Sequence, residues 1–107
     1  MKPHGNSYEN TEEHHLYEIR DKTTRTAYKF GICGEPLLPD GSSERAERQA
    51  VIFNRVAGWP RFFVLILAAN IPGRAAARRL EDARIEDFLS QHGYLPPENR
   101  DHKKFKG

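Results

Sequence analysis

Residues 14–33, HHLYEIRDKTTRTAYKFGIC, decide the fold of this 107-residue chain. Residues 15–20 alternate in side-chain character as a strand does, and residues 27–33 form a second such run. The polar, turn-like segment 21–26 separates them, so the stretch predicts an antiparallel hairpin. The side chains expected on the packed faces are His15, Tyr17 and Ile19 in the first strand, and Tyr28, Phe30 and Ile32 in the second.

A helix is predicted for residues 44–56, after a loop that contains Pro, Gly and Ser; Ser42 or Ser43 can cap it. Its pattern gives two adjacent rows of side chains. The apolar row consists of Ala46, Ala50 and Phe53. The second row, expected to form a partly buried seam with its arginine at the N-terminal end, consists of Arg45, Gln49, Ile52 and Val56.

The most hydrophobic segment is residues 62–69, FFVLILAA, and it lacks polar alternation. Such a run is typical of a strand that is covered on both faces. A turn is expected at residues 70–73, then a second helix over residues 74–91 with Gly93 as its C-cap. The predicted order is β-β-α-β-α, an α+β domain with a small, three-stranded, mainly antiparallel sheet flanked by helices.

The chain has room for one domain. Residues 1–13 are polar and aperiodic and are interpreted as a linker or disordered lead-in, residues 14–100 as the domain, and residues 101–107 as a basic tail. A single cysteine excludes an intrachain disulfide, and the apolar run is too short to span a membrane. The net charge of +2 favours no partner class by itself.

Glu81 is the most informative polar residue, because Ala77, Glu81 and Ile85 share one face of the second helix. A carboxylate on a packed face is costly unless it has a partner. Glu81 therefore either pairs with an arginine at the edge of the core or binds a hard divalent cation.

Tyr17 and Lys29 fall on neighbouring strands of the hairpin, where pairing can place them on one face. A strand tyrosine is by default a core residue, but a nearby cation lowers the pKa of a phenol, which would suit proton transfer. Arg45, by default a surface charge in the first helical turn, can instead hold a phosphate through its guanidinium fork.

These residues resemble the motifs of the GIY-YIG nuclease superfamily over residues 14–100. The matching features, in chain order, are His15-Leu16-Tyr17, Lys29-Phe30-Gly31, Arg45 with Gln49, Glu81 with Ile85, and Asn99. Two departures occur: His15 replaces the first Gly, and Lys29 stands where the second tyrosine is usual, with Tyr28 one position early. Some branches of the superfamily carry Lys there, so Lys29 is the better candidate and Tyr28 is assigned to the core.

The resemblance implies phosphodiester hydrolysis with one Mg²⁺ or Mn²⁺ bound by Glu81. Tyr17 assisted by Lys29 would act as general base, Arg45 would stabilise charge on the phosphate, and Asn99 would orient groups around it. DNA is favoured over RNA as substrate. The residues expected to contact the nucleic-acid backbone are Arg74, Arg78, Arg79, Arg84, Lys103 and Lys104.

The polar lead-in also resembles the junction before C-terminal toxin domains of polymorphic bacterial toxins. That resemblance implies a toxic effector module that acts in the cytoplasm of a target cell and is blocked by a cognate immunity protein. Without delivery, the domain would be cytoplasmic. Two alternatives stay open: a catalytically inactive nucleic-acid-binding module on the same fold, and a protein-interaction module. A zinc site is not expected, since the histidines lack ligand spacing.

Overall fold

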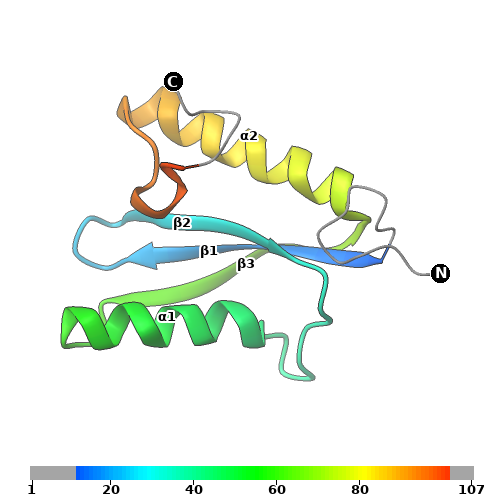
Figure 1. The fold of residues 1–107 in the computed structure, drawn as a ribbon, viewed down its shortest axis with the longest axis horizontal. Coiled ribbons are helices and arrows are strands. Elements are labelled where there is room, and N and C mark those ends of the chain that lie inside the picture. The colour runs from blue at the N-terminus through cyan, green and yellow to red at the C-terminus, as the bar shows by residue number, and fades with distance from the viewer. Residues whose placement is uncertain (1–11, 102–107) are drawn as a thin grey trace.

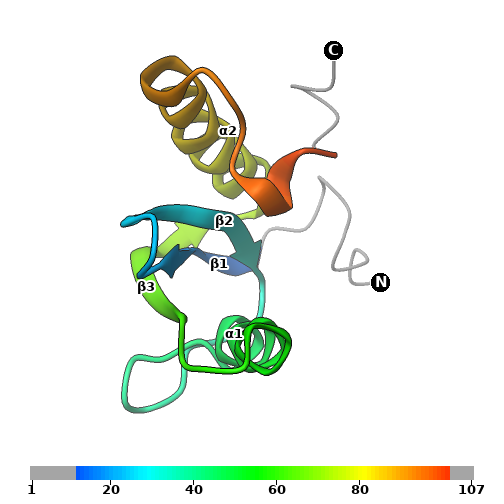
Figure 2. The ribbon, with the colours of Figure 1, turned by 90° about the vertical axis from the view of Figure 1, so that its left-hand side faces the viewer.

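The computed structural model describes residues 12–101 as a three-stranded antiparallel sheet with one helix on each face (Figures 1 and 2). The elements are β1 (Glu13–Asp21), β2 (Thr26–Cys33), α1 (Glu44–Ala57), β3 (Phe62–Pro72), α2 (Arg74–His92) and the short 3₁₀ helix η1 (Pro97–Asn99). This confirms the predicted α+β class and the order β-β-α-β-α. The predicted lead-in and tail lie almost wholly outside the described residues, so the domain boundaries stay predictions.

The strand order is β2-β1-β3, with the predicted hairpin pairing β1 to β2. The expectation that Tyr28 shares a face with Phe30 and Ile32 is wrong. The register of the hairpin shifts between Ile19 and Arg20, which leaves Tyr28 as an extra residue in β2. Tyr28 therefore packs on the α1 side of the sheet, against Phe53 and Phe62, in keeping with its assignment to the core.

The two helices cover opposite faces of the sheet, and each face has its own core. The predicted apolar row of α1 packs under the sheet, and Gly58 ends that helix in the left-handed conformation. The buried residues on the α1 side include Tyr17, Ile19, Cys33, Ala46, Ala50 and Phe62. Those on the α2 side include Leu16, Ala27, Phe30, Ile32, Ala77, Ile85 and Phe88.

Two predictions about coverage hold only in part. Val64 and Ile66 of β3 pack on the α1 side of the sheet and Leu67 and Ala68 on the α2 side, as expected of a strand covered on both faces. However, β3 is an edge strand that continues to Pro72, through the predicted turn, and its side chains Phe63 and Leu65 are 37% and 38% exposed. The predicted seam of α1 is also open, with Ile52 52% and Val56 86% exposed. Apolar composition shows that a segment can be buried, but not which element lies at the edge of the sheet.

Two asparagine side chains occupy outer edges of the sheet. The Asn99 amide accepts from the backbone N–H of Phe30 at 2.8 Å and donates to the carbonyl of the same residue at 3.0 Å. Asn54 of α1 does the same at the start of β3, accepting from Phe62 N at 2.7 Å and donating to Phe62 O at 3.1 Å. Each amide thereby takes the place of a neighbouring strand. Within the described residues, no helix is long and apolar enough to cross a membrane.

Candidate active site

An open cavity of about 200 Å³ lies along the outer edge of β2, between α1 and α2. We call it the β2 cleft. Its polar lining consists of Tyr17, Lys29, Arg45, Gln49, Arg74, Arg78, Glu81 and Asn99. All five residues predicted to be catalytic are among them, although they come from five different elements.

Tyr17 is only 2% exposed and its ring lies over Gly31, its cross-strand partner. A Cβ at position 31 would come within 2.4 Å of the Tyr17 ring and hydroxyl. The glycine of the second motif is therefore needed because it leaves the space in which the phenol lies.

Gln49 connects the two hairpin residues of the cleft. Its Oε1 accepts a hydrogen bond from the Tyr17 hydroxyl at 2.8 Å and another from Lys29 Nζ at 3.1 Å. Gln49 was named in the resemblance but not among the predicted site residues. Its place one helical turn after Arg45, on the same face of α1, was the sequence signal for it.

Burial controls the protonation of this group. It raises the pKa of Tyr17 to about 12, although the Arg45 guanidinium opposes that change. The expectation that a cation would lower the phenol's pKa thus fails, because desolvation of the phenolate is the larger effect. Burial, assisted by the positive charge of Arg45, lowers the pKa of Lys29 below its usual value. The phenol is therefore neutral near pH 7, and Lys29 is the group whose proton is held less tightly than usual.

Glu81 projects from the buried face of α2 and is 5% exposed. Its carboxylate lies 3.6 Å from Arg78 Nη1, one turn earlier on the same helix. The first predicted alternative, an ion pair with an arginine, is therefore present, and metal binding by Glu81 stays a prediction. Glu81 is the one acidic residue that lines the cleft among the described residues, facing four cationic ones: Lys29, Arg45, Arg74 and Arg78.

The start of α1 positions Arg45. Ser43 is the N-cap, as predicted, and its Oγ accepts from the backbone N–H of Ala46. The same oxygen lies 2.8 Å from Nε2 of the buried His15, and burial lowers the pKa of that imidazole. His15, which replaces the first glycine of the motif, thus ties β1 to the helix that carries Arg45.

The residues predicted to contact nucleic acid do not all line the same cavity. Arg74 and Arg78 line the β2 cleft, whereas Arg79 is exposed outside it and Arg84 lines a separate groove between α2 and the hairpin. Lys103 and Lys104 lie outside the described residues. The cleft therefore has a local group of cations, and contact of the other predicted residues with nucleic acid stays a prediction.

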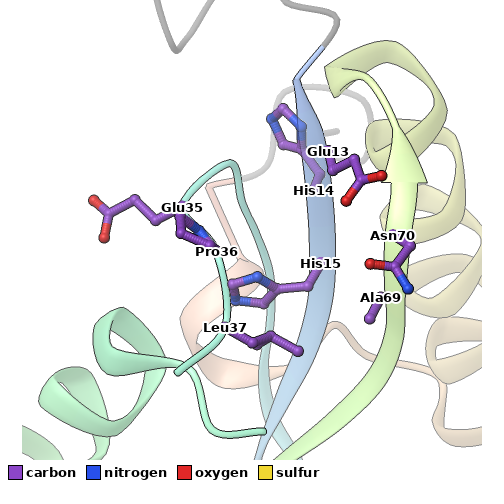
Figure 3. A pocket seen from close by; sticks show the side chains of 8 residues that line it. All are labelled: Glu13, His14, His15, Glu35, Pro36, Leu37, Ala69 and Asn70. Atoms are coloured by element: carbon purple, nitrogen blue, oxygen red, sulfur yellow. The ribbon is translucent and has the colours of Figure 1, made fainter. Parts of the chain in front are cut away.

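A second cavity, of about 250 Å³, lies where β1 begins and β2 ends (Figure 3). Glu13, His14, Glu35 and Asn70 line it, but their side chains do not converge on a common point, and Glu35 points away (Figure 3). Among the described residues, no group of three or more His, Cys, Asp or Glu side chains could hold a metal ion. The β2 cleft, which all five predicted catalytic residues line, is the better candidate for chemistry.

Comparison with known families identifies the type of domain. A family model described as URI fold toxin 2 matches residues 7–93, from before β1 to the C-cap of α2. No curated protein and no solved structure gives a significant match. The matched region carries four of the five predicted catalytic residues, and Asn99 lies just beyond it. With most of its length covered by that model, the chain belongs to the URI fold toxin 2 family of toxin domains.

Proposed function

We propose that this toxin domain is a metal-dependent endonuclease of the GIY-YIG type that hydrolyses phosphodiester bonds, with DNA favoured over RNA. One observation carries the proposal: a phenol, an amine, a guanidinium, a carboxylate and an amide from five elements line one open cleft. The order of these residues along the chain also resembles the nuclease motifs.

The donor set suits a hard divalent cation. Mg²⁺ commonly binds through one or two carboxylates while retaining several waters and contacting substrate phosphate. Glu81, held on a rigid helix and nearly buried, would supply that carboxylate. When bound, Mg²⁺ or Mn²⁺ would stabilise negative charge on the phosphate and on the leaving oxygen.

The remaining residues of the cleft would have different roles in the reaction. Arg45, Arg74 and Arg78 give the cleft the positive charge that holds a phosphodiester. The attacking water would lose its proton to Lys29 in its neutral amine form, which burial favours by lowering the pKa of that group, while Gln49 would hold Tyr17 and Lys29 together in the cleft. Asn99 fixes η1 against β2 and so shapes the wall of the cleft.

As a toxin, the domain would act on nucleic acid in the cytoplasm of a target cell after delivery. The producing cell would need a cognate immunity protein against the same activity.

The test is cleavage of supercoiled plasmid, linear DNA and total RNA by the purified domain across a Mg²⁺ and Mn²⁺ series. Glu81→Gln keeps the shape of the side chain but removes its charge. We expect it to reduce cleavage by about 100-fold or more, since a lost metal ligand removes several kcal/mol of transition-state stabilisation. Glu86→Gln, on the exposed face of the same helix, is the matched control and should cleave normally.

Toxicity on expression in bacteria should disappear with Glu81→Gln and persist with Glu86→Gln. Equal toxicity of the two variants would eliminate the nuclease proposal. Metal-independent binding to DNA without cleavage would instead favour the inactive binding module on the same fold.

A further inference from the structure

One row of α1 side chains passes from the β2 cleft onto the open surface. Arg45 and Gln49 line the cleft, and the same helix face continues with Ile52 and Val56. The sequence predicted a partly buried seam here, yet Val56 is 86% exposed. We call Ile52 and Val56 the α1 ridge.

The ridge exposes apolar side chains to solvent, which is unfavourable unless a partner covers them. Two branched apolar side chains one turn apart project from a helix whose other apolar row is buried under the sheet. Trp59, directly after the helix, is also 48% exposed. Isolated exposed apolar residues are ordinary, but two apolar neighbours on one helix face, next to a polar cleft, match the apolar centre and polar rim of an interface.

The cleft beside the ridge has the opposite character. Four cationic side chains line it against one carboxylate among the described residues. Arg45, at the junction between cleft and ridge, is exposed and forms no ion pair with any other described residue. A partner that covers both parts must therefore bring carboxylates to the cleft and apolar side chains to the ridge.

We infer that the cognate immunity protein docks on the α1 ridge and extends acidic side chains into the β2 cleft. The inference depends on the toxin function proposed above, but it does not depend on which bond the toxin breaks. The apolar ridge would contribute binding energy through the apolar area that the partner removes from water. The acidic segment would speed association and exclude the anionic substrate.

Nucleic acid is a poorer occupant of the ridge, because branched aliphatic side chains offer neither charge for phosphates nor aromatic faces for bases. The edge of β3 is another exposed apolar surface, with Phe63 and Leu65. It lies on the opposite side of the sheet from β2, so a partner bound there would not enter the cleft. Its first residue is moreover already paired by Asn54.

The test uses the toxin domain together with the neighbouring gene product whose co-expression restores growth. Ile52→Asp with Val56→Asp places carboxylates on the ridge without changing any residue assigned to the cleft. We expect this variant to stay folded and toxic, because both side chains are exposed, and to bind the immunity protein at least about tenfold more weakly. Affinity is measured by calorimetry in the Glu81→Gln background, and neutralisation by growth.

Val51→Asp is the matched control, a 47% exposed valine in a different row of the same helix. It should be neutralised like the parent. Leu65→Asp, at the β3 edge, should also be neutralised.

Normal neutralisation of the ridge variant would overturn the inference, as would escape by Leu65→Asp or self-association of the domain through the ridge. Failure to find any neutralising neighbour would overturn it too. Because calorimetry needs no cleavage, loss of the nuclease proposal would leave the binding result interpretable.

Discussion

At the scale of single residues, the cleft depends on the absence of a side chain. Gly31 leaves the space that the Tyr17 ring occupies, and the Tyr17 hydroxyl donates a hydrogen bond to Gln49 Oε1. The glycine of the second motif thus has a steric role, because the large Tyr17 on β1 requires the smallest residue, Gly31, opposite it on β2. Tyr17 is consequently one of the most completely buried residues of the domain, although it belongs to its proposed active site.

We therefore expect Gly31→Ala to lower the free energy of unfolding by about 1–3 kcal/mol, as is usual when a packed site receives an extra methyl group. It should also reduce cleavage, because the ring must move from Gln49. In a Tyr17→Val background the added methyl group has room, so the cost should nearly vanish.

The four proteins of this double-mutant cycle are compared by urea unfolding. If Gly31→Ala costs as much in the Tyr17→Val background as in the parent, the methyl group collides with something other than the ring.

The sequence was informative about some site residues and not about others. Glu81 could be identified because helical spacing alone places it on a packed face. The protonation of Tyr17 could not be predicted, because it depends on how completely three elements exclude water from the ring. Spacing indicates which face a residue occupies, whereas desolvation depends on what covers that face.

At the scale of elements, the two asparagine contacts hold parts that are distant in the sequence. Asn99 binds Phe30 from 69 positions away and seats η1 on the outer edge of β2. Asn54 fastens α1 to the beginning of β3. The contacts are chemically alike, but only the first borders the cleft.

Asn99→Ala should remove two buried hydrogen bonds and cost about 1–3 kcal/mol, because Phe30 is left with unpaired backbone groups. Hydrogen exchange should show faster exchange of the Phe30 amide, and cleavage should fall as the cleft wall loosens.

Asn54→Ala is the control of equal chemistry. It should expose the Phe62 amide to exchange while leaving cleavage close to normal. Unchanged protection of Phe30 in Asn99→Ala would refute the proposed pairing.

Element type and order followed from the periodicity of the sequence, but their exact packing did not. Alternation cannot reveal the extra residue in β2, so Tyr28 was assigned to the wrong face. Likewise the apolar run of β3 could not show that this strand lies at an edge, since strand order depends on long-range pairing. Neither error altered the predicted fold class.

At the scale of the whole molecule, one ion pair joins the end of β1 to the segment that enters β3. Asp21, at the end of β1, receives hydrogen bonds from Arg61 Nε at 2.9 Å and Nη2 at 2.8 Å, just before β3. The Arg61 guanidinium holds the pKa of the Asp21 carboxyl below its ordinary value. A depressed acidic pKa stabilises the fold above the unfolded-state pKa, and that contribution is lost as the pH falls through the folded-state value.

The contribution of Asp21 to the free energy of unfolding should therefore be nearly constant from pH 7 to about 5 and should decrease below about pH 4. Asp21→Asn should be less stable at pH 7 and should lose part of that acid dependence. Urea unfolding at a series of pH values measures both effects, with the exposed Asp87→Asn as control. If Asp21→Asn keeps the full acid dependence of the parent, the pair does not cause it.

The spread of the cleft residues along the chain has a consequence for how the toxin gains its activity. Tyr17 comes from β1 and Asn99 from η1, so a fragment must extend from residue 17 to residue 99 to contain all five proposed catalytic residues. By the proposed mechanism, a polypeptide that crosses a membrane unfolded would be inactive until residues 17–99 had emerged and folded. Truncation before residue 99 would accordingly inactivate the toxin, and folding inside the target cell would be the step that produces its activity.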